Sequence, residues 1–256
     1  MFTRVFVLQC RRFLTSPLFW ICSVLLTVVL LINSVVAFDA IPSGADLIYA
    51  YEIASTSTEA VVLTFLPSLP FALSYMEEKR EHSLRFSYVR HGVGGYVAAK
   101  YIAVILSGFG VLLFGSLLYI FVLMWFMPLI DISAGVSEAI GIAILLENKM
   151  GGTYLSAVVF CQALSAALFT SFTFFFSMLI RERYTVMVLP YLCYRISLFF
   201  QAIFKLDIDF RILLLGIPSS YSPFGGVGKK LLFVLMMLLL IGIFAVKKAE
   251  RDVLNG

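Results

Sequence analysis

Long apolar stretches separated by short charged segments dominate the pattern of this chain. A membrane-spanning helix needs about 20 consecutive apolar residues, and six stretches are candidates: residues 18–38, 59–76, 97–127, 154–180, 184–204 and 230–246. The third and fourth exceed the length of a perpendicular crossing, which indicates tilt or an extension beyond the bilayer. Pro67 and Pro70 predict a kink or local unwinding in the second. The pattern predicts an all-α integral membrane protein with one domain over residues 1–256.

Composition supports membrane insertion and excludes the soluble globular class. Hydrophobic residues make up 61% of the chain and charged residues 13%, with a mean hydropathy of +1.01. Soluble domains have about 45–50% apolar and about 25% charged residues. The net charge of +4 is spread over several loops, so it predicts no nucleic-acid partner. The four cysteines form no C-x-x-C pair and are interpreted as packing residues.

The distribution of basic residues predicts the orientation. Lys and Arg are concentrated in the N-terminal segment, after the second and fourth stretches, and in the C-terminal tail. Because cytoplasmic loops carry the excess of Lys and Arg, we expect both termini to be cytoplasmic. The predicted location is a bacterial plasma membrane, which the chain crosses several times.

Residues 1–17 form a separate basic segment ahead of the first stretch. Apolar residues recur at helical spacing, with arginines elsewhere on the helical wheel: Phe2, Val5, Phe6 and Phe13 against Arg4, Arg11 and Arg12. This arrangement is typical of a helix lying in the membrane interface. The alternative is a simple positively charged flank of the first span.

A strongly charged segment, residues 77–91, separates the second and third stretches. Each ionised side chain placed in hydrocarbon costs about 2.5–3.5 kcal/mol, so this segment must lie in water. Four apolar or aromatic residues, Leu84, Phe86, Tyr88 and Val89, are interspersed among its charges. That mixture favours contact with a soluble protein over simple solvation.

Two predicted outer segments are apolar but too short to span, residues 139–146 and 210–217. Short apolar pieces interrupted by Pro and Gly suit interfacial or re-entrant helices. The second piece could close the outer mouth of a pathway, with these candidate gate residues: Phe210, Leu213, Leu214, Pro218 and Phe224.

No catalytic or metal-binding pattern is evident. His82 and His91 lie nine residues apart, which matches no helical zinc pair. The glycine-rich residues 225–230 lack the first glycine and the hydroxyl residue of a phosphate-binding loop. We therefore expect no cofactor and no metal in this chain, and no enzymatic activity of its own.

Arg195 is an ionisable residue within a span. Either a buried functional role, helped by Gln162 or Gln201, or snorkelling of its side chain to the membrane interface would explain it.

Small residues are frequent in the fourth stretch, among them Ala157, Cys161 and Ser165. Such faces let two helices approach closely. We interpret them as helix-packing residues in preference to a substrate surface.

In order, these parts resemble the membrane subunit of a type-2 ATP-binding-cassette exporter. The resemblance rests on the basic lead-in, the six spans, the charged turn of residues 75–81 followed by residues 84–91, Lys100-Tyr101, and the broken apolar piece at 210–224. It implies a half-transporter that pairs with a second permease, identical or not, and with two cytoplasmic ATPase subunits. ATP and Mg would be bound by the ATPase.

The resemblance also implies roles for individual residues. Residues 84–91 would form a coupling helix that docks on the ATPase, and the implied contact residues are Glu77, Glu78, Arg80, Leu84, Arg85, Phe86, Tyr88 and Arg90. The second and fifth spans would line the pathway, with Phe65, Pro67, Pro70, Phe71, Arg195 and Gln201. Apolar walls would suit a hydrophobic or amphipathic cargo such as a peptide toxin, bacteriocin, antibiotic or lipid.

Two other classes of function stay open at this point. An intramembrane enzyme would need a convergent set of acid, base or metal ligands within the spans. A passive channel or membrane scaffold would account for the spans but would give the charged segment no purpose. Association with an ATPase separates the exporter from both.

Overall fold

A computed structural model describes residues 2–37, 47–48, 50–55, 65–81, 84–127, 151–180, 182–204 and 225–254. These residues form helices and turns, with no strand among them, which confirms the all-α prediction. The long helices are α2 (Pro17–Ala37), α6 (Val93–Leu123), α8 (Gly151–Leu179), α9 (Arg183–Phe204) and α11 (Gly225–Leu254). Shorter helices include α1 (Phe2–Leu14), α4 (Ser74–Arg80) and α5 (Leu84–His91).

Among the described residues, four helices are long and apolar enough to cross a membrane: Pro17–Val35, Val93–Leu123, Gly151–Leu179 and Lys230–Leu254. They coincide with the first, third, fourth and sixth predicted stretches, so the chain is a multi-pass membrane protein. The last helix continues to Leu254, beyond the predicted end at residue 246. Its charged final turns therefore extend the helix past the apolar stretch.

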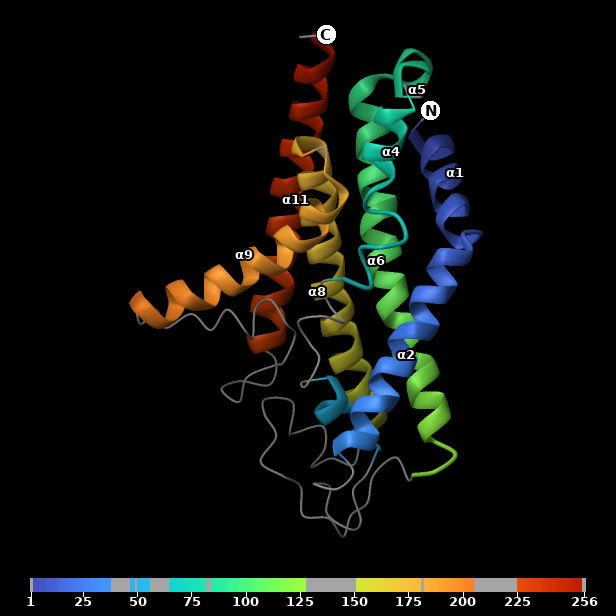
Figure 1. The fold of residues 1–256 in the computed structure, drawn as a ribbon, viewed down its shortest axis with the longest axis vertical. Coiled ribbons are helices and arrows are strands. Elements are labelled where there is room, and N and C mark those ends of the chain that lie inside the picture. Colours follow the sequence, from blue (N-terminus) through green and yellow to red (C-terminus); the bar gives the residue numbers. More distant parts are fainter. Residues whose placement is uncertain are drawn as a thin grey trace.

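The other two predicted spans have different structures. The described part of the second, residues 65–73, is a series of turns around Pro67 and Pro70 before α4 begins. The predicted unwinding is confirmed there, since a proline removes a helical hydrogen bond and clashes with the preceding turn. The fifth is helical over the whole predicted range, but Figure 1 shows α9 leaving the bundle at a wide angle.

The helix α8 lies at the centre of the bundle. In its most apolar part 78% of the residues are buried, against 44% for α6, 39% for α2 and 22% for α11. Small residues explain this position: a Cβ atom added at Gly108 of α6 would lie 2.1 Å from Thr170 Oγ1 of α8. This close approach is the kind of helix packing that the small residues of the fourth stretch predict.

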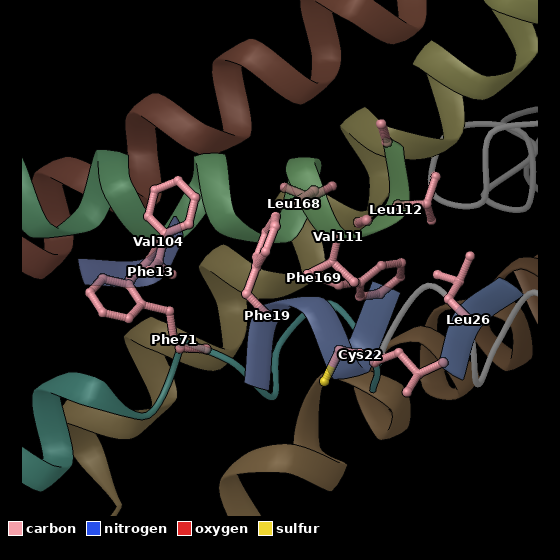
Figure 2. Close-up of a cluster of buried hydrophobic side chains, with 14 of the residues drawn as sticks. Phe13, Phe19, Cys22, Leu26, Phe71, Val104, Val111, Leu112, Leu168 and Phe169 are labelled. Carbon is pink, nitrogen blue, oxygen red and sulfur yellow. The ribbon is translucent and has the colours of Figure 1, made fainter. Parts of the chain in front are cut away.

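A second close contact joins α2 to α6. A Cβ atom at Gly115 would lie 2.6 Å from Leu26 Cδ2 and 2.8 Å from the backbone oxygen of Ser23. Thr27 Oγ1 donates a hydrogen bond to the backbone oxygen of Gly115 at 2.9 Å. Figure 2 shows Leu26 and Phe19 of α2 within the same apolar cluster as Val111 of α6.

The first helix packs along α6 through Val5, Gln9 and Phe13, all buried, and leaves Val7 and Leu8 exposed. Phe13 also meets Phe71 of the turn segment at 6.1 Å between ring centroids, as seen in Figure 2. The helix α1 is therefore partly a packing element, with an outer apolar edge available to lipid.

The start of α1 and the end of α11 lie at the same end of the bundle, together with α4 and α5 (Figure 1). We call this the terminal end. It carries the charged segment that the sequence predicted to lie in water.

Candidate functional site

A sharp turn between α5 and α6 sets the geometry of the terminal end. Gly92 separates the two helices with φ +74 and ψ 146, a left-handed backbone conformation that glycine adopts without a Cβ clash. The Gly92 N–H donates to the Tyr88 carbonyl at 2.9 Å, and the Tyr96 N–H donates to the Gly92 carbonyl at 3.2 Å. The short helix α5 is thus attached directly to the first turn of a membrane-spanning helix.

Beside this turn, a carboxylate joins three helices. Arg12 Nη1 of α1 donates to Glu78 Oε1 at 2.6 Å, and Tyr96 Oη of α6 donates to Glu78 Oε2 at 2.6 Å. Lys100 of α6 forms an ion pair with the same Oε2 atom. Gln9 of α1 donates to Tyr96 Oη at 3.4 Å. We call these five residues the Glu78 node.

Two charges of the Glu78 node are almost completely buried. The side chain of Glu78 is 8% exposed and that of Lys100 is 0% exposed, whereas Arg12 is 57% exposed. The Lys100 ammonium also lies 6.0 Å from the ring centroid of Phe71 and 5.8 Å from that of Tyr96, within cation–π range. Removing one partner of such a buried pair costs about 3–5 kcal/mol, because the other charge is left without compensation.

The environment of Glu78 favours its ionised form. Burial by itself raises the pKa of this carboxyl, but the Lys100 charge and the hydrogen bonds from Lys100, Tyr96 and Arg12 outweigh it, so the pKa lies below the ordinary value. Glu78 therefore stays negative at neutral pH and compensates the buried lysine.

The residues on either side of Glu78 make ion pairs with two further helices. Arg183 Nη2 of α9 lies 3.2 Å from Glu77 Oε1, and Lys79 Nζ lies 3.3 Å from Asp252 Oδ2 of α11. Lys248 also pairs with Asp252, at 2.7 Å. The exposed fractions of the paired side chains range from 26% to 49%, and pairs of this kind contribute about 0–1 kcal/mol each. Three successive residues of α4 thus contact α1, α6, α9 and α11.

The helix α5 has one inward and one outward side. Leu84 is buried at 6% exposure, and Tyr88 Oη lies 3.1 Å from Tyr75 Oη with its ring 5.9 Å from that of Tyr96. Phe86 and Val89 are 80% and 91% exposed. Burial raises the pKa of Tyr88, so its phenol stays protonated.

The predicted partner contacts stay predictions, and their positions in the chain differ. Leu84 and Glu78 are buried and Tyr88 is half-buried, so these three side chains pack largely within the protein. Arg80 and Arg90 are exposed and Glu77 is half-buried, as a partner contact requires. Arg85 belongs to α5, but its side chain lies outside the described residues, as does His82.

A cavity of about 1280 Å³ opens beside α4 and α5. Its other walls come from the last turn of α8, the first residues of α9 and the end of α11. The lining combines apolar and charged side chains, including Met76, Val89, Met178, Ile180, Arg183 and Asp252. A smaller cavity of about 420 Å³ lies at the Glu78 node itself, where Gln9, Arg12, Glu78 and Tyr96 line it.

The described pathway residues divide between two places: Phe65 and Arg195 both contact Tyr191 of α9, whereas Phe71 packs against α1. Phe71 is buried against Phe13 of α1, and Pro67 is buried while Pro70 is half-buried. The Phe65 ring lies 6.1 Å from that of Tyr191 in α9. Phe71 therefore belongs to the packing around α1, whereas Phe65 faces α9.

Arg195 lies exposed on α9. Its Nε atom donates to Tyr191 Oη at 2.8 Å, and its guanidinium lies 5.5 Å from the Tyr191 ring centroid. Gln162 accepts a hydrogen bond from Tyr51 Oη at 2.6 Å instead of meeting Arg195. The Gln201 side chain and the predicted gate residues Phe210, Leu213, Leu214, Pro218 and Phe224 lie outside the described residues.

The sequence interpretation missed two buried lysines. Lys100, in α6, is part of the Glu78 node, and Lys230, in α11, donates to Ser165 Oγ of α8 at 2.9 Å. The available signal was the lysine itself, since an ionisable residue in an apolar stretch needs a partner or water. The sequence alone could not identify the partner of Lys100, because Glu77, Glu78 and Glu81 precede it at similar distances along the chain.

Within the described residues no cluster of three or more His, Cys, Asp or Glu could hold a metal ion. No protein-family model matches the chain, and no curated protein or solved structure is significantly similar to it.

Proposed function

We infer that this chain is the membrane subunit of an ATP-driven exporter, and that α5 is the segment that docks on a separate ATPase. The observation that carries this proposal is the exposure of Phe86 and Val89, at 80% and 91%, on a short helix whose inner side is attached to the bundle. Apolar side chains this exposed, surrounded by charged residues, are typical of a protein interface.

The attachment of α5 supports a role in transmitting force. Leu84 and Tyr88 hold its inner side, and the turn at Gly92 joins it to α6. The Glu78 node links the preceding helix, α4, to α1 and α6. A push on the exposed side of α5 would therefore reach a membrane-spanning helix directly, because packed helices move as rigid elements.

The complete proposed assembly contains two permeases and two ATPase subunits that bind ATP and Mg. Within each permease we propose six spans, with the second and fifth completed by the turn segment and α9, and cytoplasmic termini in a bacterial plasma membrane. The proposed cargo is hydrophobic or amphipathic, with a peptide toxin, bacteriocin or antibiotic as the preferred class. The apolar composition of the spans supports this choice.

Copurification tests the proposal. The tagged chain, extracted from native membranes with a mild detergent, is expected to bring with it a subunit that carries a phosphate-binding loop and hydrolyses ATP. Replacing both exposed residues, Phe86→Asp and Val89→Asp, should abolish recovery of that subunit while the permease keeps its helical content and its yield. The fold should survive because both side chains lie in solvent.

A matched control is Leu254→Asp, which places the same charge at an apolar residue that is 84% exposed at the terminal end. It should leave recovery of the ATPase unchanged. The proposal fails if the unmodified chain consistently purifies without an ATPase. The docking assignment alone fails if the double substitution of α5 has no more effect than the control.

A further inference from the structure

The terminal end contains two kinds of ion pair, and they differ in burial. The Glu78 node joins α4 to α6 through a carboxylate and an ammonium that water hardly reaches, and the same carboxylate accepts a hydrogen bond from Arg12 of α1. The pairs Glu77–Arg183 and Lys79–Asp252 join α4 to α9 and α11 through side chains that are at least 26% exposed. We call the second set the bridging pairs.

The bridging pairs lie at the large cavity. All four of their residues line it, and they connect the α4 wall to the opposite walls formed by α9 and α11. Further charged residues around the same cavity are Arg80, Glu182 and Lys248. Separation of α4 from α9 and α11 would therefore break two solvated ion pairs, each of which water can replace, together with the apolar contacts that bury Leu73, Met76 and Val186.

We propose that Glu77, Lys79, Arg183 and Asp252 are positioning residues that hold the large cavity narrow and release it during the transport cycle. The Glu78 node meanwhile keeps α1, α4 and α6 together as one moving unit. This inference rests on the proposed function for the source of the force, but the contacts themselves can be tested on the permease alone.

Access to a buried residue at the cavity wall provides the measurement. Ser177 of α8 lines the cavity, is 2% exposed, and differs from cysteine by one atom. Ser177→Cys is introduced after the four native cysteines, Cys10, Cys22, Cys161 and Cys193, are replaced by alanine. The rate at which a water-soluble maleimide labels the purified chain in detergent then reports how far the cavity opens.

Neutralising a bridging pair should speed labelling. Glu77→Gln and Lys79→Gln are each expected to raise the rate about two- to five-fold, the range that weak exposed pairs allow, and the double variant should raise it further. Glu81→Gln is the matched control, since Glu81 is exposed at the end of α4 and forms no ion pair among the described residues. It should not change the rate.

A charge exchange separates a specific pair from a general change in charge. Glu77→Arg combined with Arg183→Glu should return labelling toward the rate of the parent chain, whereas Glu77→Arg alone should label fastest. Raising the salt concentration from about 0.05 M to about 1 M should speed labelling of the parent and leave the double neutral variant unaffected, because salt screens exposed pairs.

The inference is overturned if both single neutral variants label at the rate of the parent, or if the charge exchange fails to slow labelling relative to Glu77→Arg alone. Either result would refute the positioning role even if an ATPase copurifies with the chain. Conversely, faster labelling of the neutral variants would support the positioning role even if no ATPase is found. The two proposals can therefore fail separately.

Discussion

The middle of the bundle and its terminal end hold their helices together by different physical means. Between α6 and α8 the contact is steric, with Gly108 directly facing Thr170. At the terminal end it is electrostatic, with Glu78 compensating Lys100 and reaching Arg12. An added atom is therefore costly at Gly108, whereas a missing partner is costly at the buried Glu78–Lys100 pair.

The largest effect is expected from Glu78→Gln. This change keeps the shape of the side chain but leaves the fully buried Lys100 without a counter-charge, which should cost about 3–5 kcal/mol of the free energy of unfolding. The measurement is the melting temperature of the purified chain in detergent. Glu81→Gln, an exposed residue of the same segment, should melt like the parent, and equal melting of the two variants would contradict the electrostatic account of the terminal end.

The steric contact is tested by Gly108→Ala. The new Cβ would lie 2.1 Å from Thr170 Oγ1 and 2.7 Å from Thr170 Cβ, so α6 and α8 must separate. Overpacking of this kind costs about 1–3 kcal/mol. Gly95→Ala is the control on the same helix, because a Cβ there meets nothing within 4 Å. The packing argument fails if both variants have the same thermal stability.

Acid should weaken the terminal end before it affects the middle. Because the pKa of Glu78 is lower in the folded chain than in the unfolded chain, its contribution is complete above the unfolded pKa and is lost as the pH falls through the folded pKa. Melting temperatures followed from neutral to acidic pH should fall more steeply for the parent than for Glu78→Gln, and parallel curves would exclude Glu78 as the responsible group.

The smallest effect is expected from Lys79→Gln. Lys79 and Asp252 are 48% and 26% exposed, and Asp252 keeps its contact with Lys248. The free energy of unfolding should change by about 0–1 kcal/mol, and high salt should remove the difference from the parent. Melting at low and high salt measures both points. If Lys79→Gln lowered the free energy of unfolding as much as Glu78→Gln does, the exposure of an ion pair would not determine how much it contributes to stability.

Much of the fold could be predicted from the sequence because hydrocarbon tolerates so few arrangements. A long apolar stretch must be helical to satisfy its backbone, and the four candidate spans agree with four of the predicted stretches. The turns around Pro67 and Pro70 followed from the geometry of proline. The direction of α9 could not be predicted, because helix orientation depends on contacts that no stretch reveals alone.

The candidate site was less predictable. The sequence placed Leu84, Phe86, Tyr88 and Val89 together on one charged segment, but it could not separate the inward from the outward side chains. An eight-residue helix with a weak amphipathic pattern contains too little periodic signal. Its neighbours Tyr75 and Tyr96, which hold Tyr88, come from two other helices.

By itself, the sequence determined that this chain enters the membrane as apolar helices and leaves a charged segment outside, because the transfer energies of its side chains permit little else. Only the tertiary structure decided that Glu78 faces inward to Lys100 while Phe86 and Val89 face solvent. The physical reason is that a buried charge needs a partner at contact distance, and the partner is chosen by how α1, α4 and α6 pack.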